Sequence, residues 1–89
     1  MTLTEYVKKI SDKIQQSPYS YNEIISEAER VLDKSNITER GKKQFWIDLY
    51  NSLKDFFKLH QSYSFESQGS DELSKAVAMA KSIIAKKAS

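Results

Sequence analysis

The sequence predicts an all-α protein, an antiparallel four-helix bundle whose third helix is the longest. Four stretches of the 89-residue chain place apolar residues at helical spacing. The chain holds only two glycines and one proline, fewer turn residues than an all-β fold needs. The first connections are short, so neighbouring helices should run antiparallel. We expect one domain over residues 1–89, with helices at about 3–16, 21–34, 37–60 and 71–87.

The first helix is indicated by an apolar stripe made of Leu3, Val7, Ile10 and Ile14. Thr2 followed by Glu5 has the spacing of a capping box, in which each side chain bonds to the backbone N–H of the other residue. Pro18 should end this helix, because proline cannot continue the backbone hydrogen bonds.

The second helix carries the stripe Tyr21, Ile24, Ile25, Ala28, Val31 and Leu32. Ser20 and Glu23 form a second capping-box pattern, and Tyr19 and Ile24 stand at the positions of a hydrophobic staple. Two start signals therefore predict the same first residue for this helix.

The third helix should form the centre of the core. On a helical wheel its large apolar residues share an arc of about 120°, namely Phe45, Trp46, Leu49, Tyr50, Leu53, Phe56 and Phe57. Either Asn36 with Glu39, or Thr38 alone, is expected to cap its start. Core packing is a better interpretation of this aromatic arc than a cofactor pocket.

The fourth helix has a narrow apolar face made of Leu73, Ala76, Val77, Ala80, Ile83 and Ile84. Ser70 can cap it, and acidic residues at its start and lysines at its end suit the helix dipole. Its small alanines allow close approach to the bulky third helix. The alternative is a three-helix domain with a loosely attached fourth segment.

Composition argues against most enzymes. The chain has no cysteine and a single histidine, too few for thiolate or histidine metal sites. Gly41 and Gly69 are isolated, so there is no glycine-rich phosphate loop. His60 continues the apolar arc near a helix C-terminus, where a structural role is favoured over that of a general base. We expect no catalytic residue, no metal and no cofactor.

The sequence also predicts a cytoplasmic location. No stretch approaches the ~20 apolar residues of a membrane-spanning helix. Charges interrupt residues 1–13 where a signal peptide needs its apolar segment.

Charge is distributed unevenly along the chain. Residues 1–35 carry five basic and six acidic side chains, whereas residues 36–89 carry nine and six. On the wheel of the third helix, a group that we call the basic strip falls within about 60° opposite the core arc and contains Arg40, Lys43, Ile47, Lys54 and Lys58. The strip is either an ordinary exposed face or a docking site for an acidic protein surface or anionic lipid headgroups.

A nucleic-acid partner is not expected. The second and third helices resemble a helix-turn-helix in their order, but the third helix is long and mostly committed to the core. A net charge of +2 is low for binding driven by phosphate contacts.

The link at residues 61–69 contains two aromatic residues in a polar setting. Tyr63 and Phe65 either cover the open end of the bundle near Phe57 and Leu73, or form part of a partner-binding surface. A purely solvated tether would not need them.

The whole chain resembles the immunity proteins of class IIa (pediocin-like) bacteriocins, the enterocin A immunity family. The segment "YVKKISDKIQQSPYSYNEIISEAERVLDK" is similar to the family's first helical hairpin. The segment "FWIDLYNSLKDFFKLHQSYSFESQGSDELSKAVAMAKSI" is similar to its third helix, turn and fourth helix.

The resemblance implies a cytoplasmic protein that protects the producing cell from its own pore-forming peptide. It would bind the peptide-loaded mannose phosphotransferase permease, with specificity in the second half of the molecule and the protein at the inner face of the membrane. The family's C-terminal tail has no counterpart after Ser89, and the third link is longer, so recognition should move to the 61–69 link and the third helix. The alternatives are a small helical adaptor or regulator for a soluble protein and, less favoured, a DNA-associated regulator.

Overall fold

The predicted all-α fold is confirmed. The computed structural model describes the backbone of residues 2–66 and 71–89, and the side chains of residues 2–59 and 72–89. Its elements are α1 (Leu3–Gln16), the short 3₁₀ helix η1 (Pro18–Ser20), α2 (Tyr21–Lys34), α3 (Glu39–Glu66) and α4 (Asp71–Ala88).

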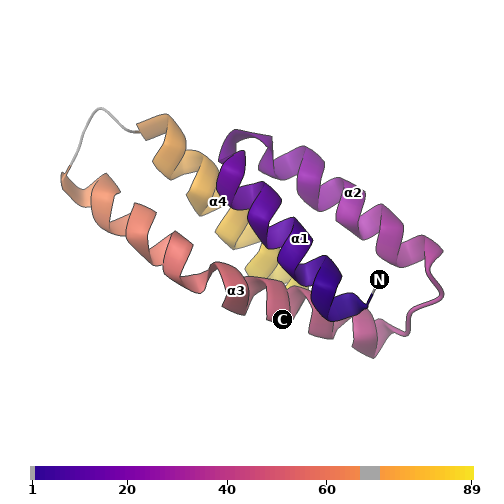
Figure 1. Cartoon of the computed structure of the whole chain (residues 1–89). Helices are drawn as coiled ribbons and strands as arrows, with labels where there is room; N and C mark the ends of the chain where they lie inside the picture. The colour runs from indigo at the N-terminus through magenta and orange to yellow at the C-terminus, as the bar shows by residue number, and fades with distance from the viewer. Residues whose placement is uncertain (1, 67–70) are drawn as a thin grey trace.

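The four helices form an elongated bundle in which successive helices run in opposite directions (Figure 1). α1 packs against α2 and α3, and α4 packs against α3 and α2, so the order around the bundle is α1, α2, α4, α3. The pairing of α3 with α4 is the most extensive, as the small residues of α4 predict. α3 has 28 residues and α1 and α2 have 14 each, so the end of α3 extends beyond them (Figure 1).

The start of α1 is a complete capping box, as predicted. The Glu5 backbone N–H donates to Thr2 Oγ1 at 3.1 Å, and the Thr2 backbone N–H donates to Glu5 Oε1 at 2.9 Å. The hydrogen bond from the Thr2 backbone N–H to the carboxylate is the main cause that holds the pKa of Glu5 below its ordinary value of 4.5, and the Thr2 side chain adds to the effect. The ionised form of Glu5 therefore stabilises the folded state.

Replacing Glu5 with Gln tests this contribution. Because the pKa of Glu5 is lower in the folded than in the unfolded chain, its stabilisation is present above the ordinary value and is lost as the pH falls through the folded value. We expect Glu5→Gln to lower the melting temperature near pH 7 and to match the wild type near pH ~2. Thermal unfolding followed by circular dichroism measures the difference, and a difference that stays constant with pH would contradict the assignment.

The predicted capping box at the start of α2 is wrong. Ser20 makes no side-chain capping bond, because it closes η1 with near-helical angles (φ −94°, ψ 16°). An N-cap side chain needs extended backbone to reach the first free N–H groups. Tyr19, proposed for the staple, is 63% exposed.

Of the two caps proposed for α3, the structure has Thr38. Thr38 Oγ1 accepts from the Gly41 backbone N–H at 3.1 Å, whereas Asn36 adopts a left-handed conformation with φ 52° in the link that precedes it. A Cβ added at Gly41 would meet Ile37 Cγ2 at 2.7 Å, so glycine lets the chain fold tightly over this first turn.

α3 does not end near residue 60 as predicted but continues to Glu66. The two serines and the glutamine of residues 61–66 suggested a link, yet this stretch contains neither Gly nor Pro, and nothing in it forces a helix to stop. The helical backbone therefore includes Tyr63 and Phe65. Their side chains, and that of His60, lie outside the described residues.

The core follows the predicted faces of the four helices. Its buried hydrophobic residues come from all of them and are Val7, Ile10, Ile14, Ile25, Ala28, Leu32, Phe45, Trp46, Leu49, Leu53, Phe57, Ala76, Val77, Ala80 and Ile84. Phe45 and Trp46 pack edge to face with ring centroids 5.0 Å apart, so the aromatic arc does form the core. Leu3 and Val31, predicted in the apolar stripes, are 38% and 40% exposed, although Leu32 beside Val31 is buried.

Across the described residues, no helix has both the length and the hydropathy required to cross a membrane.

Candidate functional site

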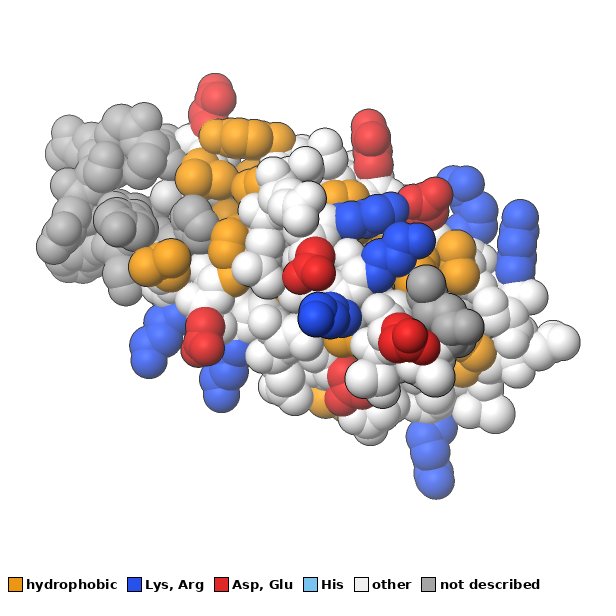
Figure 2. Space-filling model, in the orientation of Figure 1, with side chains coloured by type: hydrophobic (Ala, Val, Ile, Leu, Met, Phe, Trp, Pro, Cys, Tyr) orange, Lys and Arg blue, Asp and Glu red, His pale blue; other side chains and the backbone are white. Residues whose placement is uncertain are grey.

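The basic strip lies on α3 as predicted. Its four cationic side chains, those of Arg40, Lys43, Lys54 and Lys58, are exposed. From Arg40 to Lys58 the strip extends about 27 Å at 1.5 Å per residue, so it is a long face and not a compact pocket. Along the lower edge of Figure 2, over α3, the side chains that project furthest are Lys or Arg.

The apolar member of the strip, Ile47, is half-buried. It lines a shallow hollow of about 210 Å³ between α3 and the end of α4, which we call the alanine groove and which is lined by Ile47, Tyr50, Asn51, Ala85, Ala88 and Ser89. A wheel drawn for α3 alone places Ile47 opposite the core. It could not show that α4 packs over this edge of the helix.

The proposed contribution of Tyr63 and Phe65 stays a prediction. Both belong to the last turns of α3, and their side chains lie outside the described residues. The groove and the basic strip are therefore described without them.

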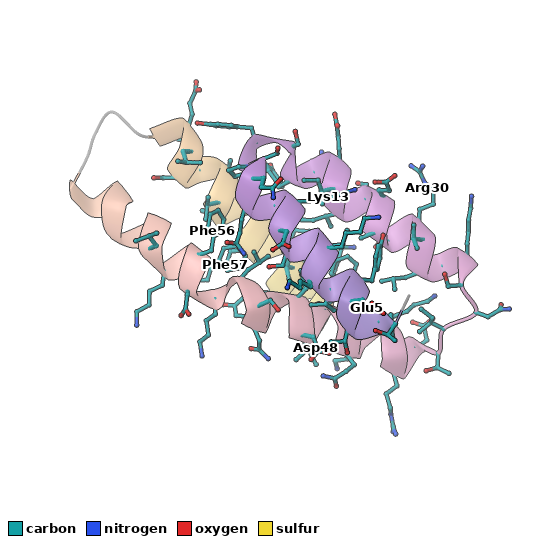
Figure 3. All side chains as sticks on the ribbon, viewed as in Figure 1. Glu5, Lys13, Arg30, Asp48, Phe56 and Phe57 are labelled. Carbon is teal, nitrogen blue, oxygen red and sulfur yellow. The ribbon has the colours of Figure 1, made fainter. Side chains whose placement is uncertain are left out.

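Three of the four acidic side chains of α2 pair with lysines of the other three helices. Glu27 lies 4.0 Å from Lys13, which points from α1 toward α2 (Figure 3). Asp33 forms an ion pair with Lys42 of α3 at 3.0 Å, and Glu29 forms one with Lys87 of α4. Negative charge is thus concentrated on the α2 side of the bundle and is largely compensated there.

The ion pairs of Asp33 and Glu29 border a second hollow, the charged cleft, of about 410 Å³ between α2, α3 and α4. Lys42 also lies 3.6 Å from Glu39, and its hydrogen bond to Asp33 is the main cause that raises the pKa of Lys42. The Lys87 ammonium group lies 5.3 Å from the centroid of the Trp46 ring. Lys42 and Lys87 pair with acidic residues of the cleft, and the pair of Lys87 with Glu29 connects the end of α4 to α2.

A third hollow, of about 540 Å³, follows α1 and α3, and most of the residues that line it are polar or charged. Ser11, which is 3% exposed, accepts a hydrogen bond from Gln15 Nε2 at 3.1 Å, and Asp48 accepts one from Gln44 Nε2 at 2.9 Å. The sequence patterns did not indicate this groove. The available signal was a serine one turn after Val7 on an otherwise apolar stripe.

The basic strip and the alanine groove place exposed positive charge beside a small, mostly apolar hollow. Within residues 2–59 and 72–89, no three His, Asp or Glu side chains lie close enough together to hold a metal ion. No protein-family model matches the chain, and neither a curated protein nor a solved structure matches it.

Proposed function

We propose that the chain is a bacteriocin immunity protein that protects the producing cell against a pore-forming peptide of the class IIa type. It acts from the cytoplasm, at the inner face of the membrane, by binding the receptor complex to which the peptide is bound. By the resemblance of the sequence, that receptor is the mannose phosphotransferase permease.

The observation that carries the proposal is the long α3 paired along α4 within a four-helix bundle (Figure 1). The resemblance of the sequence implies this helix order and these relative lengths. The exposed basic strip lies on the same α3–α4 half of the molecule, where the resemblance puts partner specificity. This half is rigidly supported, since five of its apolar residues on α3 and four on α4 are buried in the core.

A protection assay tests the function directly. The chain is expressed in a strain that is sensitive to pediocin-like peptides, and the strain is challenged with a panel of them. We expect growth to survive at least one peptide at a concentration that kills the strain carrying the empty vector. No protection against any peptide, with the folded protein present in the cells, would favour an adaptor for a soluble partner.

Charge reversal in the basic strip tests where the protein acts. We expect the triple variant Arg40→Glu, Lys43→Glu and Lys58→Glu to lose protection while it remains folded, because these exposed side chains contribute little to stability. The matched control reverses three other exposed cations on α1 and α2, Lys9, Arg30 and Lys34. Equal protection by both triple variants would show that the strip has no part in binding.

A further inference from the structure

We propose that the alanine groove receives one aliphatic side chain of an acidic amphipathic helix, and that the basic strip binds the carboxylates of that helix. The inference rests on the proposed function for the biological role of the contact. It goes further in naming the chemistry of the partner segment and the point where it docks.

The size and lining of the groove indicate what fits it. Its volume of about 210 Å³ lies below the range of roughly 300–1,000 Å³ that is typical of small-molecule pockets. Ile47, Tyr50, Ala85 and Ala88 give it an apolar lining, and the two alanines leave the space open because their side chains are short. A hollow of this kind holds a single aliphatic side chain from a partner surface.

Charge complementarity indicates the rest of the partner. The ion pairs of Glu27, Glu29 and Asp33 compensate lysines on the other three helices. Arg40 and Lys54 are exposed and make no ion pair with the described residues. Unpaired positive charge therefore remains along α3, on both sides of Ile47, where an acidic segment can bind.

Helical spacing joins the two features. Lys54 follows Ile47 by two helical turns, about 10.5 Å along α3. A partner helix laid along α3 with a leucine in the groove places a residue seven positions away beside Lys54, and an acidic residue there forms an ion pair. A helix with one leucine, and with glutamates on the same face on both sides of it, meets both requirements.

The shape of the surface favours such a helix over a lipid bilayer. Peripheral proteins insert apolar side chains that project into the headgroup region. Here the apolar side chain of the strip, Ile47, is half-buried at the edge of a hollow. The groove therefore accepts an apolar group from a partner and does not supply one.

The test uses a synthetic capped peptide of about 18 residues, mostly alanine and glutamine, with one central leucine and glutamates four and seven positions from it on both sides. Binding to the full chain is measured by fluorescence anisotropy at low salt. We expect affinity to fall at least about tenfold when Ala85→Leu fills the groove or when the peptide leucine is replaced by alanine. Lys54→Glu should weaken binding by a similar factor and reduce its salt dependence.

Two matched controls accompany these variants. Ala78→Leu adds the same side chain at an exposed position of α4 outside the groove, and Lys9→Glu makes the same charge change on α1. Both should leave the affinity unchanged. If Ala85→Leu does not fold, Ile47→Gln serves instead, because it places a polar amide in the groove.

Peptide affinity that is unaffected by Ala85→Leu would overturn the inference. Vesicles of phosphatidylcholine with about one-third phosphatidylglycerol provide a second test. The inference would also be overturned if the chain bound these vesicles more tightly than the peptide and if Ala85→Leu did not change that binding. A chain that binds the peptide but protects no cell would refute the proposed function and leave the groove assignment standing. Protection that Ala85→Leu retains would refute the groove and leave the function standing.

Discussion

Replacing Leu53 with Ala is expected to lower the free energy of unfolding by about 2–5 kcal/mol. Leu53 is fully buried on the face of α3 that meets the other helices, so its removal leaves a cavity that the rigid surroundings fill only in part. In a chain of this length the loss corresponds to a fall of roughly 10–25 °C in melting temperature. Urea unfolding followed by circular dichroism gives the free energy directly.

Leu59→Ala is the matched control, because it makes the same change six residues later on another face of the same helix. Leu59 is 54% exposed, and we expect an effect within about 0.5 kcal/mol. If both variants lose the same stability, the core face of α3 has been assigned wrongly.

Ala80→Leu is expected to destabilise the protein by about 1–3 kcal/mol, although it adds apolar surface and keeps a good helix former. Ala80 is 1% exposed, on the face of α4 in the core, and its small side chain lets α4 approach α3 closely. A leucine there must push the helices apart or adopt a strained rotamer. The sign of the effect is therefore the opposite of what hydrophobicity alone suggests.

Ala78→Leu separates overpacking from any general effect of leucine in α4. Residue 78 is exposed, so the change should stay within about 0.5 kcal/mol of the wild type. A stabilised Ala80→Leu protein would show that the contact between α3 and α4 is looser than the structure describes.

Periodicity predicted the helices and most of the core because each amphipathic face must be buried by something. It could not say how far the covering neighbours extend. Leu3 and Val31 lie on the predicted stripes but are partly exposed, and Ser11 is buried among apolar residues. These differences depend on the relative lengths and positions of helices, which no single segment encodes.

Composition was a poorer guide to helix ends than specific hydrogen-bonding residues. The Thr2–Glu5 box and the Thr38 cap form as the residue types allow. Ser20 does not cap, because the preceding η1 turn changes its backbone angles. The polar residues of the 61–66 stretch predict a link by composition, but their helix propensity is only slightly lower and they continue α3.

The candidate site could likewise be predicted only in part. Wheel geometry predicted that the cations of the basic strip lie on one exposed side of α3, because the residues of a single helix are enough to define that side. The alanine groove needs Ile47 and Ala85 from two helices, and the charged cleft needs Glu29, Trp46 and Lys87 from three. Such contacts depend on how the helices are aligned along one another, and the sequence alone does not give that alignment.

The single tryptophan gives the protein a built-in optical reporter. Trp46 is 5% exposed and lies beneath the end of α4, with the Lys87 ammonium group 5.3 Å from its ring centroid. Its emission therefore depends on whether the last turn of α4 is in place, and no other indole contributes to the signal. Detachment of that turn can be followed in the unlabelled protein, in real time and separately from the helical content of the whole bundle.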